Sequence, residues 1–281
     1  MTTLRTVQKE GAARLSEAGI EQADREAAWL LEYVTGRPGL DFLLHDAATA
    51  DPVVVKRFLA LVERRVAGEP LQYVMGSAEF YGRLFTVGPG VLIPRPETEH
   101  LVELALARAP GHGAILDLCT GSGIIPITLA LELPQRCCIV GVDISLTALS
   151  YAHRNGREHG APVAWVAGDL AEPLRRDAQF TMITANPPYI SPPEYEALSP
   201  EVRDHEPKLA LHADANGLAL IDRIAAAARR LLAPGGSVLC EIGSEQGPAA
   251  AECFIAHGFG DVQIEPDLTR RDRFIWAQQH P

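Results

Sequence analysis

The stretch Asp117-Leu118-Cys119-Thr120-Gly121-Ser122-Gly123 decides the fold class of this 281-residue chain. It continues the apolar run Ala114–Leu118, which predicts a strand, and a helix is predicted over residues 123–132. A tight glycine turn between a strand and a helix brings backbone N–H groups close to a ligand, because no Cβ obstructs the approach. A plain strand-to-helix turn is the alternative, since glycine pairs are common in such loops.

Beyond this turn the chain keeps alternating between apolar, strand-like runs and helical stretches. The predicted elements are a helix from Glu97, helices over 145–158 and 215–232, and strands over Ile139–Val142, Val163–Val166, Phe180–Thr184, Val238–Ile242, Val262–Glu265 and Phe274–Ala277. This alternation predicts an α/β fold with a mostly parallel, Rossmann-like sheet covered on both faces. The Pro-rich stretch 187–200 is predicted to be one long irregular connection, and such loops are usually functional.

The N-terminal part has a different texture. Apolar residues recur there at helical spacing, as in Leu4, Val7, Ala12 and Leu15, and Asp51-Pro52 is an N-cap and N1 pair. Two strand-like runs around Gly82 then predict a hairpin. We therefore expect a helical bundle over residues 1–75, a hairpin linker over 76–92 and an α/β domain over 93–281.

The charge of the chain is strongly acidic, with a formal net charge of −11. Residues 1–75 carry 11 acidic and 9 basic groups, which leaves 25 acidic and 16 basic groups, a net −9, for residues 76–281. A surface that binds nucleic-acid phosphates or an anionic membrane needs the opposite balance. We therefore expect neither direct nucleic-acid binding nor a membrane partner.

Targeting and metal-binding signals are not evident in the sequence. The N-terminal residues lack the apolar core of a secretory signal, and no apolar run approaches the length of a membrane span. Five cysteines, mostly in apolar runs, favour reduced, buried thiols in a cytoplasmic protein. The nearest metal-ligand cluster is Asp204-His205-Glu206, and adjacent loop residues rarely converge on one ion, so we expect no metal.

Asp143 favours a ligand-binding role for the glycine turn over a plain turn. It follows the predicted strand Ile139–Val142, twenty residues after Gly123, where a carboxylate can accept both hydroxyls of a ribose. Pro126 replaces the third glycine of the dinucleotide pattern G-x-G-x-x-G. NAD and S-adenosylmethionine both remain open at this point, and the pattern leans towards a mononucleoside ligand.

The second candidate site is Asn186-Pro187-Pro188-Tyr189, directly after the predicted strand Phe180–Thr184. A rigid exit loop is the plain alternative. However, ligands of open α/β sheets bind beside the carboxyl ends of strands, where this segment and the glycine turn would meet.

The residue types of this segment suit the methylation of a planar NH₂ group. Its nitrogen is a poor nucleophile because the lone pair is delocalised, and it improves when two acceptors hold both hydrogens. Asn186 Oδ1 and the Pro187 carbonyl could be those acceptors, since the residue before a proline is held extended, and the Tyr189 ring could pack on the planar group.

The chain resembles the HemK-type N5-glutamine methyltransferases (PrmC family) that modify peptide chain release factors. The resemblance covers nearly the full length and is strongest from Arg64 onwards. The matching stretches are Arg64–Tyr73, Pro89–Glu99 with Ile93-Pro94-Arg95-Pro96-Glu97-Thr98-Glu99, Asp117–Gly123, Asn186–Ile190, Glu206–Leu211 and Leu232–Gly243. Asn-Pro-Pro-Tyr alone also occurs in DNA adenine methyltransferases, whereas the stretch around Arg95 is more specific.

The resemblance implies a seven-stranded class I methyltransferase domain with an antiparallel final strand, and an N-terminal bundle that docks the release factor. It implies S-adenosylmethionine as the methyl donor and the glutamine of a Gly-Gly-Gln motif as the substrate. For the cofactor, it implies that Asp143 holds the ribose, that Asp169 and Leu170 border the adenine, and that the methionine end is held by the turn Cys119, Thr120, Gly121, Ser122 and Gly123. For the substrate, it implies that the glutamine amide is held by Asn186, Pro187, Pro188 and Tyr189. Asn186 would also lie beside the cofactor.

Three positions depart from the family pattern. Cys119 stands where a glycine is usual, Leu170 stands where tryptophan is frequent, and Thr269–Arg273 replaces a more glycine-containing stretch. For Arg95 and Glu97, a salt-bridged helix start is at least as good an interpretation as substrate contact.

We therefore expect an enzyme that methylates release-factor glutamine. The alternatives are N-methylation of an exocyclic amine in nucleic acid, methylation of glutamine in another protein, and a catalytically silent binding module. A duplex-DNA enzyme must flip a base and grip the backbone, which the net −9 disfavours.

Overall fold

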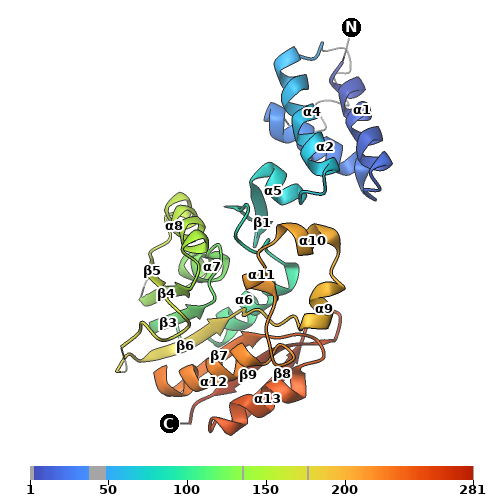
Figure 1. The fold of residues 1–281 in the computed structure, drawn as a ribbon. Coiled ribbons are helices and arrows are strands. Elements are labelled where there is room, and N and C mark those ends of the chain that lie inside the picture. Colours follow the sequence, from blue (N-terminus) through green and yellow to red (C-terminus); the bar gives the residue numbers. More distant parts are fainter. Residues whose placement is uncertain (1–2, 38–48, 135, 176, 281) are drawn as a thin grey trace. The chain divides into compact units, whose positions relative to one another are not determined.

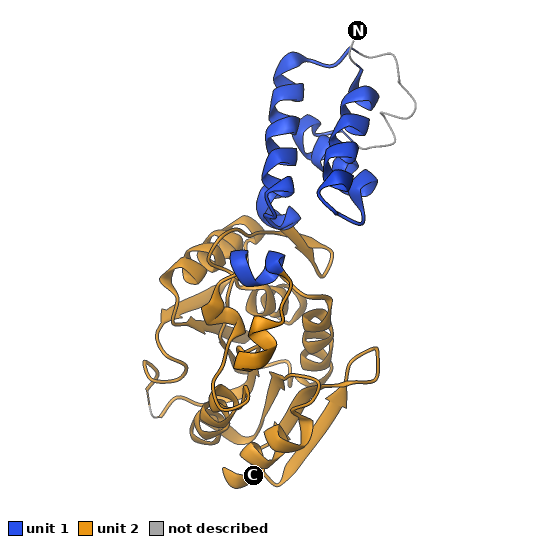
Figure 2. Cartoon of the chain, turned by 45° about the vertical axis from the view of Figure 1, so that its right-hand side comes forward, with its two compact units in different colours: residues 1–77, 200–205 blue, residues 78–199, 206–281 orange. Residues whose placement is uncertain are grey.

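The computed structural model describes residues 3–37, 49–134, 136–175 and 177–280, and Figure 1 follows their helices and strands along the chain. Two compact units are present. One comprises Met1–Ser77 and Pro200–His205, and the other comprises Ala78–Ser199 and Glu206–Pro281 (Figure 2).

The first unit is helical, as the spacing of its apolar residues predicts. Its helices are α1 (Leu4–Glu17), α2 (Ala23–Thr35), α4 (Pro52–Val66), α5 (Leu71–Met75) and α10 (Pro200–His205). Buried side chains such as Leu15, Leu30 and Phe58 form its core. The Asp51 carboxylate accepts a hydrogen bond from the Val53 N–H at 2.8 Å, which confirms the predicted start of α4.

Helix α10 joins this unit from far along the sequence. The Arg65 guanidinium on α4, itself buried, pairs with Glu26 at 2.6 Å and with Glu201 of α10 at 3.0 Å. The helix before it in the sequence, α9 (Pro192–Glu196), belongs to the second unit and begins after Ser191, whose N–H and hydroxyl both donate to Glu194. The prediction of one irregular connection over residues 187–200 was therefore wrong, because its prolines stand at helix starts, where a missing N–H needs no partner.

The second unit is built on a seven-stranded sheet, which confirms the predicted α/β class (Figure 1). Its strand order is β5-β4-β3-β6-β7-β9-β8. The strands are β3 (Gly113–Leu118), β4 (Cys137–Asp143), β5 (Val163–Ala167), β6 (Phe180–Ala185), β7 (Leu232–Glu241), β8 (Asp261–Pro266) and β9 (Asp272–Gln278). Neighbours from β5 to β7 pair in parallel, and β9 pairs antiparallel with both β7 and β8.

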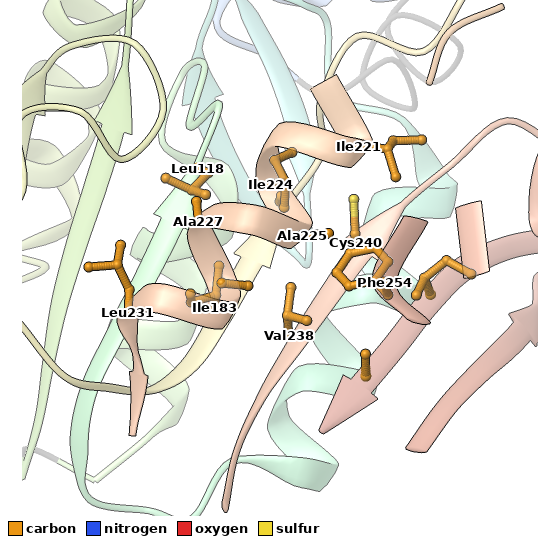
Figure 3. Close-up of a cluster of buried hydrophobic side chains, with 14 of the residues drawn as sticks. Leu118, Ile183, Ile221, Ile224, Ala225, Ala227, Leu231, Val238, Cys240 and Phe254 are labelled. Atoms are coloured by element: carbon orange, nitrogen blue, oxygen red, sulfur yellow. The ribbon is translucent and has the colours of Figure 1, made fainter. Parts of the chain in front are cut away.

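Helices cover both faces of this sheet. They are α6 (Pro96–Arg108), α7 (Ile124–Glu132), α8 (Leu146–His159), α12 (Ala219–Leu231) and α13 (Gly247–Ala256), and the same unit also contains the short helix α11 (Lys208–Leu211). Alternate residues of β3 serve the two faces: Leu118 packs with α12 and α13, and Ile115 packs with α6 and α7. Figure 3 shows the first of these clusters, with Ile224 of α12 and Phe254 of α13 among the buried side chains.

A two-stranded hairpin of β1 (Ser77–Phe80) and β2 (Arg83–Thr86) turns at Tyr81-Gly82, as predicted. Its buried Phe80 and Phe85 rings pack edge to face, with centroids 6.1 Å apart, in the cluster on the α6 and α7 face.

The cysteines only partly match their prediction. All five are free thiols, and Cys240 is fully buried, but Cys138 is exposed and Cys119, Cys137 and Cys253 are partly exposed. The expectation of buried thiols was wrong for Cys138, because alternate residues at the start of β4 face away from the core. Within the described ranges, no helix combines the length and the apolar character that crossing a membrane requires.

Candidate functional site

A cavity of about 370 Å³ lies in the second unit at the carboxyl ends of its parallel strands. This volume falls in the range of small-molecule sites. Residues that follow β3, β4, β5 and β6 line it, together with the segment before α6 and parts of α11 and α12. The cavity thus lies where open α/β sheets bind their ligands.

The predicted glycine turn forms one wall of this cavity. Cys119, Thr120, Gly121 and Ser122 line it, while Gly123 is the N-cap residue of α7 and is packed against the Trp165 ring. Gly121 has a φ of +57° with open space where a Cβ would stand, so the turn exposes its backbone to the cavity.

Two non-glycine residues on the cavity wall have left-handed backbones. Cys119 has a φ of +58° and Leu170 a φ of +48°. A Cβ in this conformation costs about 1–2 kcal/mol. That cost accounts for the glycine usually found at the Cys119 position in the family pattern, and strain of this kind concentrates at functional sites.

The carboxylate of Asp117 supports the turn from behind and does not line the cavity. Its Oδ2 accepts a hydrogen bond from Thr120 Oγ1 at 2.5 Å, and its Oδ1 accepts one from Thr184 Oγ1 at 2.6 Å. The side chain is fully buried, and this desolvation raises the pKa of Asp117 to about 7 although both hydroxyls oppose the shift. Asp117 therefore ties the turn to β6.

Asp143 also lines the cavity, next to the glycine turn, and holds the turn in place. Its Oδ2 accepts a hydrogen bond from the Gly121 N–H and its Oδ1 accepts one from the Ser145 N–H, both at 2.8 Å. Burial raises the pKa of this carboxyl, and the backbone donors oppose the shift. A carboxylate has about four acceptor positions, so Asp143 retains capacity for two hydroxyl groups of a ligand.

Asp169 and Leu170 also reach the cavity. The Asp169 carboxylate pairs with Arg223 of α12 at 2.8 Å, and Arg223 is a lining residue that the sequence did not indicate. Both side chains are well exposed, so the ion pair adds little stability. Leu170 supplies an apolar surface where the family frequently has an aromatic ring.

The Asn186–Tyr189 segment divides between two places. Asn186 and Pro188 line the cavity, and Pro187 is buried beside them in the chain. Tyr189 lies instead on a second cavity of about 390 Å³, with Arg273 and Gln246, and its hydroxyl donates to Glu241 Oε1 at 3.4 Å. The structure thus brings Asn186, Pro188 and the glycine turn together but does not place the Tyr189 ring on the same wall.

The stretch Arg95–Glu99 connects the site to its surroundings. Arg95 pairs with the buried Glu206 at 2.5 Å, and the other Glu206 oxygen accepts from the Ile93 N–H at 3.0 Å. Arg95 thus has the salt bridge of one interpretation, and it also lines the cavity, as the other interpretation, substrate contact, requires. Glu99 accepts a hydrogen bond from the Tyr81 N–H at 2.8 Å and so anchors the hairpin.

Besides Arg223, sequence reasoning did not select Thr98 or Glu241, and it considered Glu206 only as a possible metal ligand. Thr98 Oγ1 accepts from Asn186 Nδ2 at 3.0 Å and donates to Glu241 Oε2 at 2.9 Å. Thr98, Glu206 and Glu241 all stand in stretches that carry the family resemblance, which was the available signal. Only the fold brings them to Asn186 and Arg95.

Gly217 packs against the backbone of Tyr189, at the end of the Asn186–Tyr189 segment, so its replacement should be costly. Gly217 has a φ of +80°, and a Cβ there would stand 2.0 Å from the Tyr189 carbonyl oxygen. Gly217→Ala is expected to lower the free energy of unfolding by about 1–3 kcal/mol beyond the backbone strain alone, and to reduce turnover because Tyr189 must move.

Gly235→Ala is the matched control for this prediction. Gly235 has a φ of +78° with nothing within 4 Å of the added Cβ, so only the strain of about 1–2 kcal/mol remains. Urea unfolding of both variants measures the difference. Equal losses of stability would show that the contact with Tyr189 has no cost.

Metal-ligand geometry does not appear at the site. Among the residues that the structure describes, no group of three His, Cys, Asp or Glu side chains is placed to hold a metal ion. Glu206, which the sequence placed in the nearest candidate cluster, is instead engaged by Arg95 and the Ile93 backbone.

Solved structures with the same architecture include a methyltransferase from Pyrococcus furiosus. It superposes with a TM-score of 0.55 at 16% sequence identity and covers 72% of this chain and 91% of its own. At this identity the similarity establishes the fold alone, that of a class I methyltransferase domain.

Sequence relatives are much closer. A family model described as the PrmC N-terminal domain matches residues 6–76, and one described as a methyltransferase domain matches residues 115–205. The release factor glutamine methyltransferase of Geobacter sulfurreducens is 40% identical over 273 residues, which cover 97% of this chain and 95% of that protein. The protein of the same name from Neisseria gonorrhoeae is 41% identical and covers 88% of this chain and 90% of its own length. The chain belongs to the release factor glutamine methyltransferase family.

Proposed function

We propose that this protein transfers a methyl group from S-adenosylmethionine to the side-chain amide nitrogen of the glutamine in the Gly-Gly-Gln motif of peptide chain release factors. The observation that carries the proposal is the position of Asn186. Its amide lies on the wall of the same cavity as the glycine turn and Asp143, at the carboxyl ends of the strands. Methylation of a nucleic-acid amine is not favoured, because the close relatives are named for release factor glutamine.

The residues around the cavity fit a nucleoside cofactor with a polar tail. Gly121 leaves room for close backbone approach, Asp143 retains acceptor capacity for ribose hydroxyls, and Leu170 offers an apolar surface for a base. In this proposal the turn Cys119–Gly123 holds the methionine end and Asp169 borders the adenine. When bound, S-adenosylmethionine supplies an electrophilic methyl group on a positively charged sulfur.

The protein's part in the reaction is to position the substrate amide. Asn186 Oδ1 and the Pro187 carbonyl accept the two amide hydrogens, which directs the nitrogen at the methyl group. As the new C–N bond forms, the bond between the methyl carbon and the sulfur would break and leave a neutral thioether, and the nitrogen would lose one proton to water or to an acceptor. Holding the two reacting atoms in line can contribute roughly 7–11 kcal/mol to lowering the barrier. Tyr189 is the residue whose predicted contact with the amide requires a movement on binding.

One experiment tests the substrate assignment directly. The protein is incubated with methyl-labelled cofactor, a purified release factor and duplex DNA in the same tube, and the label is located by mass spectrometry. We expect it on the glutamine of the Gly-Gly-Gln motif. Label on DNA bases, or on a different glutamine, contradicts the proposal.

The same proposal gives the N-terminal unit a docking role for the release factor. It keeps the domains expected from the sequence, a helical bundle over residues 1–75, a hairpin linker over 76–92 and a methyltransferase domain over 93–281. It also keeps the expected cytoplasmic location. Deleting residues 1–70 should reduce activity on a whole release factor more than on a short Gly-Gly-Gln peptide. The reason is that only the whole factor has surface beyond the motif to contact. Initial rates on both substrates measure the effect.

Cofactor affinity and thermal unfolding of the truncated protein serve as controls, since both should remain close to the full-length values. Equal loss of activity on the two substrates would argue against docking by this unit.

A further inference from the structure

The Asn186 side chain is held by a buried chain of two hydrogen bonds. Asn186 Nδ2 donates to Thr98 Oγ1 at 3.0 Å, and Thr98 Oγ1 donates to Glu241 Oε2 at 2.9 Å. Thr98 and Glu241 are each 1% exposed. Thr98 stands in the first turn of α6 and Glu241 is the last residue of β7, so the Asn186–Thr98–Glu241 chain joins three elements at the cavity.

The direction of these hydrogen bonds follows from the chemistry of the three groups. An ionised carboxylate only accepts, and a hydroxyl has one hydrogen to donate. With Glu241 ionised, the Thr98 hydrogen points to Glu241, and Thr98 can only accept from Asn186. The Asn186 amide must then turn its NH₂ towards Thr98, which leaves Oδ1 on the cavity side.

We propose that Thr98 and Glu241 are positioning residues for methyl transfer, and that they fix the orientation of the Asn186 amide so that its oxygen faces the substrate. This inference rests on the proposed function, because the acceptor is needed for an amide substrate. A flipped Asn186 would present its NH₂ to the substrate NH₂, two donors face to face, and would hold no hydrogen of the reacting nitrogen.

The protonation state of Glu241 determines the orientation of the Asn186 amide. Burial raises the pKa of Glu241 to about 7, and Glu97 adds to the shift, while Thr98, Arg273 and the Tyr189 hydroxyl oppose it. The groups facing Glu241 are Thr98 and Glu97 of α6, Tyr189 after β6 and Arg273 of β9, with Cys240 beside it on β7. When Glu241 takes up a proton it can donate to Thr98, which frees the Thr98 hydrogen for Asn186 Oδ1.

Variants of Thr98 test the proposal first. Thr98→Val keeps the shape of the side chain and removes both hydrogen bonds, so kcat on a Gly-Gly-Gln peptide should fall about tenfold, as for other supporting partners of site residues. The KM for the cofactor should change by less than about twofold, and Thr98→Ser should restore most of kcat. A normal kcat in Thr98→Val, or Thr98→Ser as slow as Thr98→Val, would overturn the proposal.

The pH profile distinguishes positioning from simple packing. At saturating cofactor and peptide, kcat of the wild-type protein should fall as the pH is lowered through about 7. Glu241→Gln can both donate and accept, so it should give a lower kcat without this acid limb. The pKa of Asp117 is also raised to about 7, so its titration is a second possible cause of a pH effect. Asp117 supports the cofactor turn, so its titration should change the KM for the cofactor and not kcat at saturating cofactor. An unchanged acid limb in Glu241→Gln would contradict the proposal.

A spectroscopic readout separates this inference from the proposed function. The side-chain ¹⁵N–¹H signals of Asn186, assigned by their loss in Asn186→Ala, should shift with a midpoint near pH 7 in the wild-type protein and not in Glu241→Gln. Absence of methylation by the wild-type protein would defeat the proposed function, and with it the catalytic use of the Asn186 orientation, but not the orientation itself. Signals of Asn186 that do not respond to pH would defeat the positioning role alone.

Discussion

Asn186→Ala is expected to lower the turnover number by about a hundredfold or more while cofactor affinity changes only a few-fold, as for loss of one preorganised hydrogen-bonding group in an active site. The variant removes the Oδ1 acceptor on the cavity wall and leaves the glycine turn and Asp143 intact. Thr98 loses its donor but keeps its hydrogen bond to Glu241, so α6 should stay in place. Single-turnover rates on a purified release factor measure the chemical step.

Gln263→Ala is the control for loss of an amide side chain, because Gln263 is exposed on β8 and its amide donates to Asp261 at 3.2 Å, away from the cavity lining. Its turnover should match that of the wild-type protein. Near-normal turnover in Asn186→Ala would remove Asn186 from the mechanism, and a parallel loss of cofactor affinity would reassign it to cofactor binding.

The fold was predictable because its signals are local. Apolar runs such as Val163–Val166 and the turn at Gly121 each reflect a few neighbouring residues. The alternation of strands and helices predicted a parallel sheet, and the observed strand pairing confirms it. The prediction of one irregular connection in the Pro-rich region 187–200 failed because a local signal can be ambiguous. A proline such as Pro192 suits both an irregular loop and the first turn of a helix, and only the hydrogen bonds of Ser191 with Glu194 decide between them.

The site was predictable only where chemistry follows directly from residue type. Asn186, Asp143 and the glycine turn were selected in that way, and the fold brings them to one cavity. Thr98 and Glu241 could not be selected, since a threonine in a helix and a glutamate at a strand end have many ordinary roles. They are separated by 143 positions in the sequence and become partners only through the packing of α6 against β7.

Buried carboxylates show the same limit on prediction from sequence. Asp117 and Glu206 look like candidate site acids, yet each carboxylate is engaged on both oxygens by neighbouring groups of the protein. Their contribution to the reaction is to hold the turn after β3 and the start of α6. Charge alone therefore does not separate an acid that contacts a ligand from one that supports the residues that do.

Asp143→Ala should weaken binding of the cofactor about a hundredfold, since hydrogen bonds to a charged group contribute about 1.5–3 kcal/mol each and more than one is lost. The variant removes the acceptor for the ribose hydroxyls and also releases the Gly121 and Ser145 N–H groups that the carboxylate holds at 2.8 Å. At saturating cofactor the turnover number should recover most of its value, because Asn186 and Thr98 are untouched. Calorimetric titration with S-adenosylhomocysteine measures the affinity.

Two further variants show whether the effect belongs to the position of Asp143. Asp177→Ala removes an exposed carboxylate that pairs with Arg175 and is not part of the cavity lining, so the affinity should not change. Asp169→Ala removes a lining carboxylate whose ion pair with Arg223 is well exposed, so we expect a loss of only a few-fold. An Asp143→Ala protein with wild-type affinity would show that the ribose is held elsewhere. A loss in Asp169→Ala as large as that in Asp143→Ala would shift the main polar contact to the end of β5.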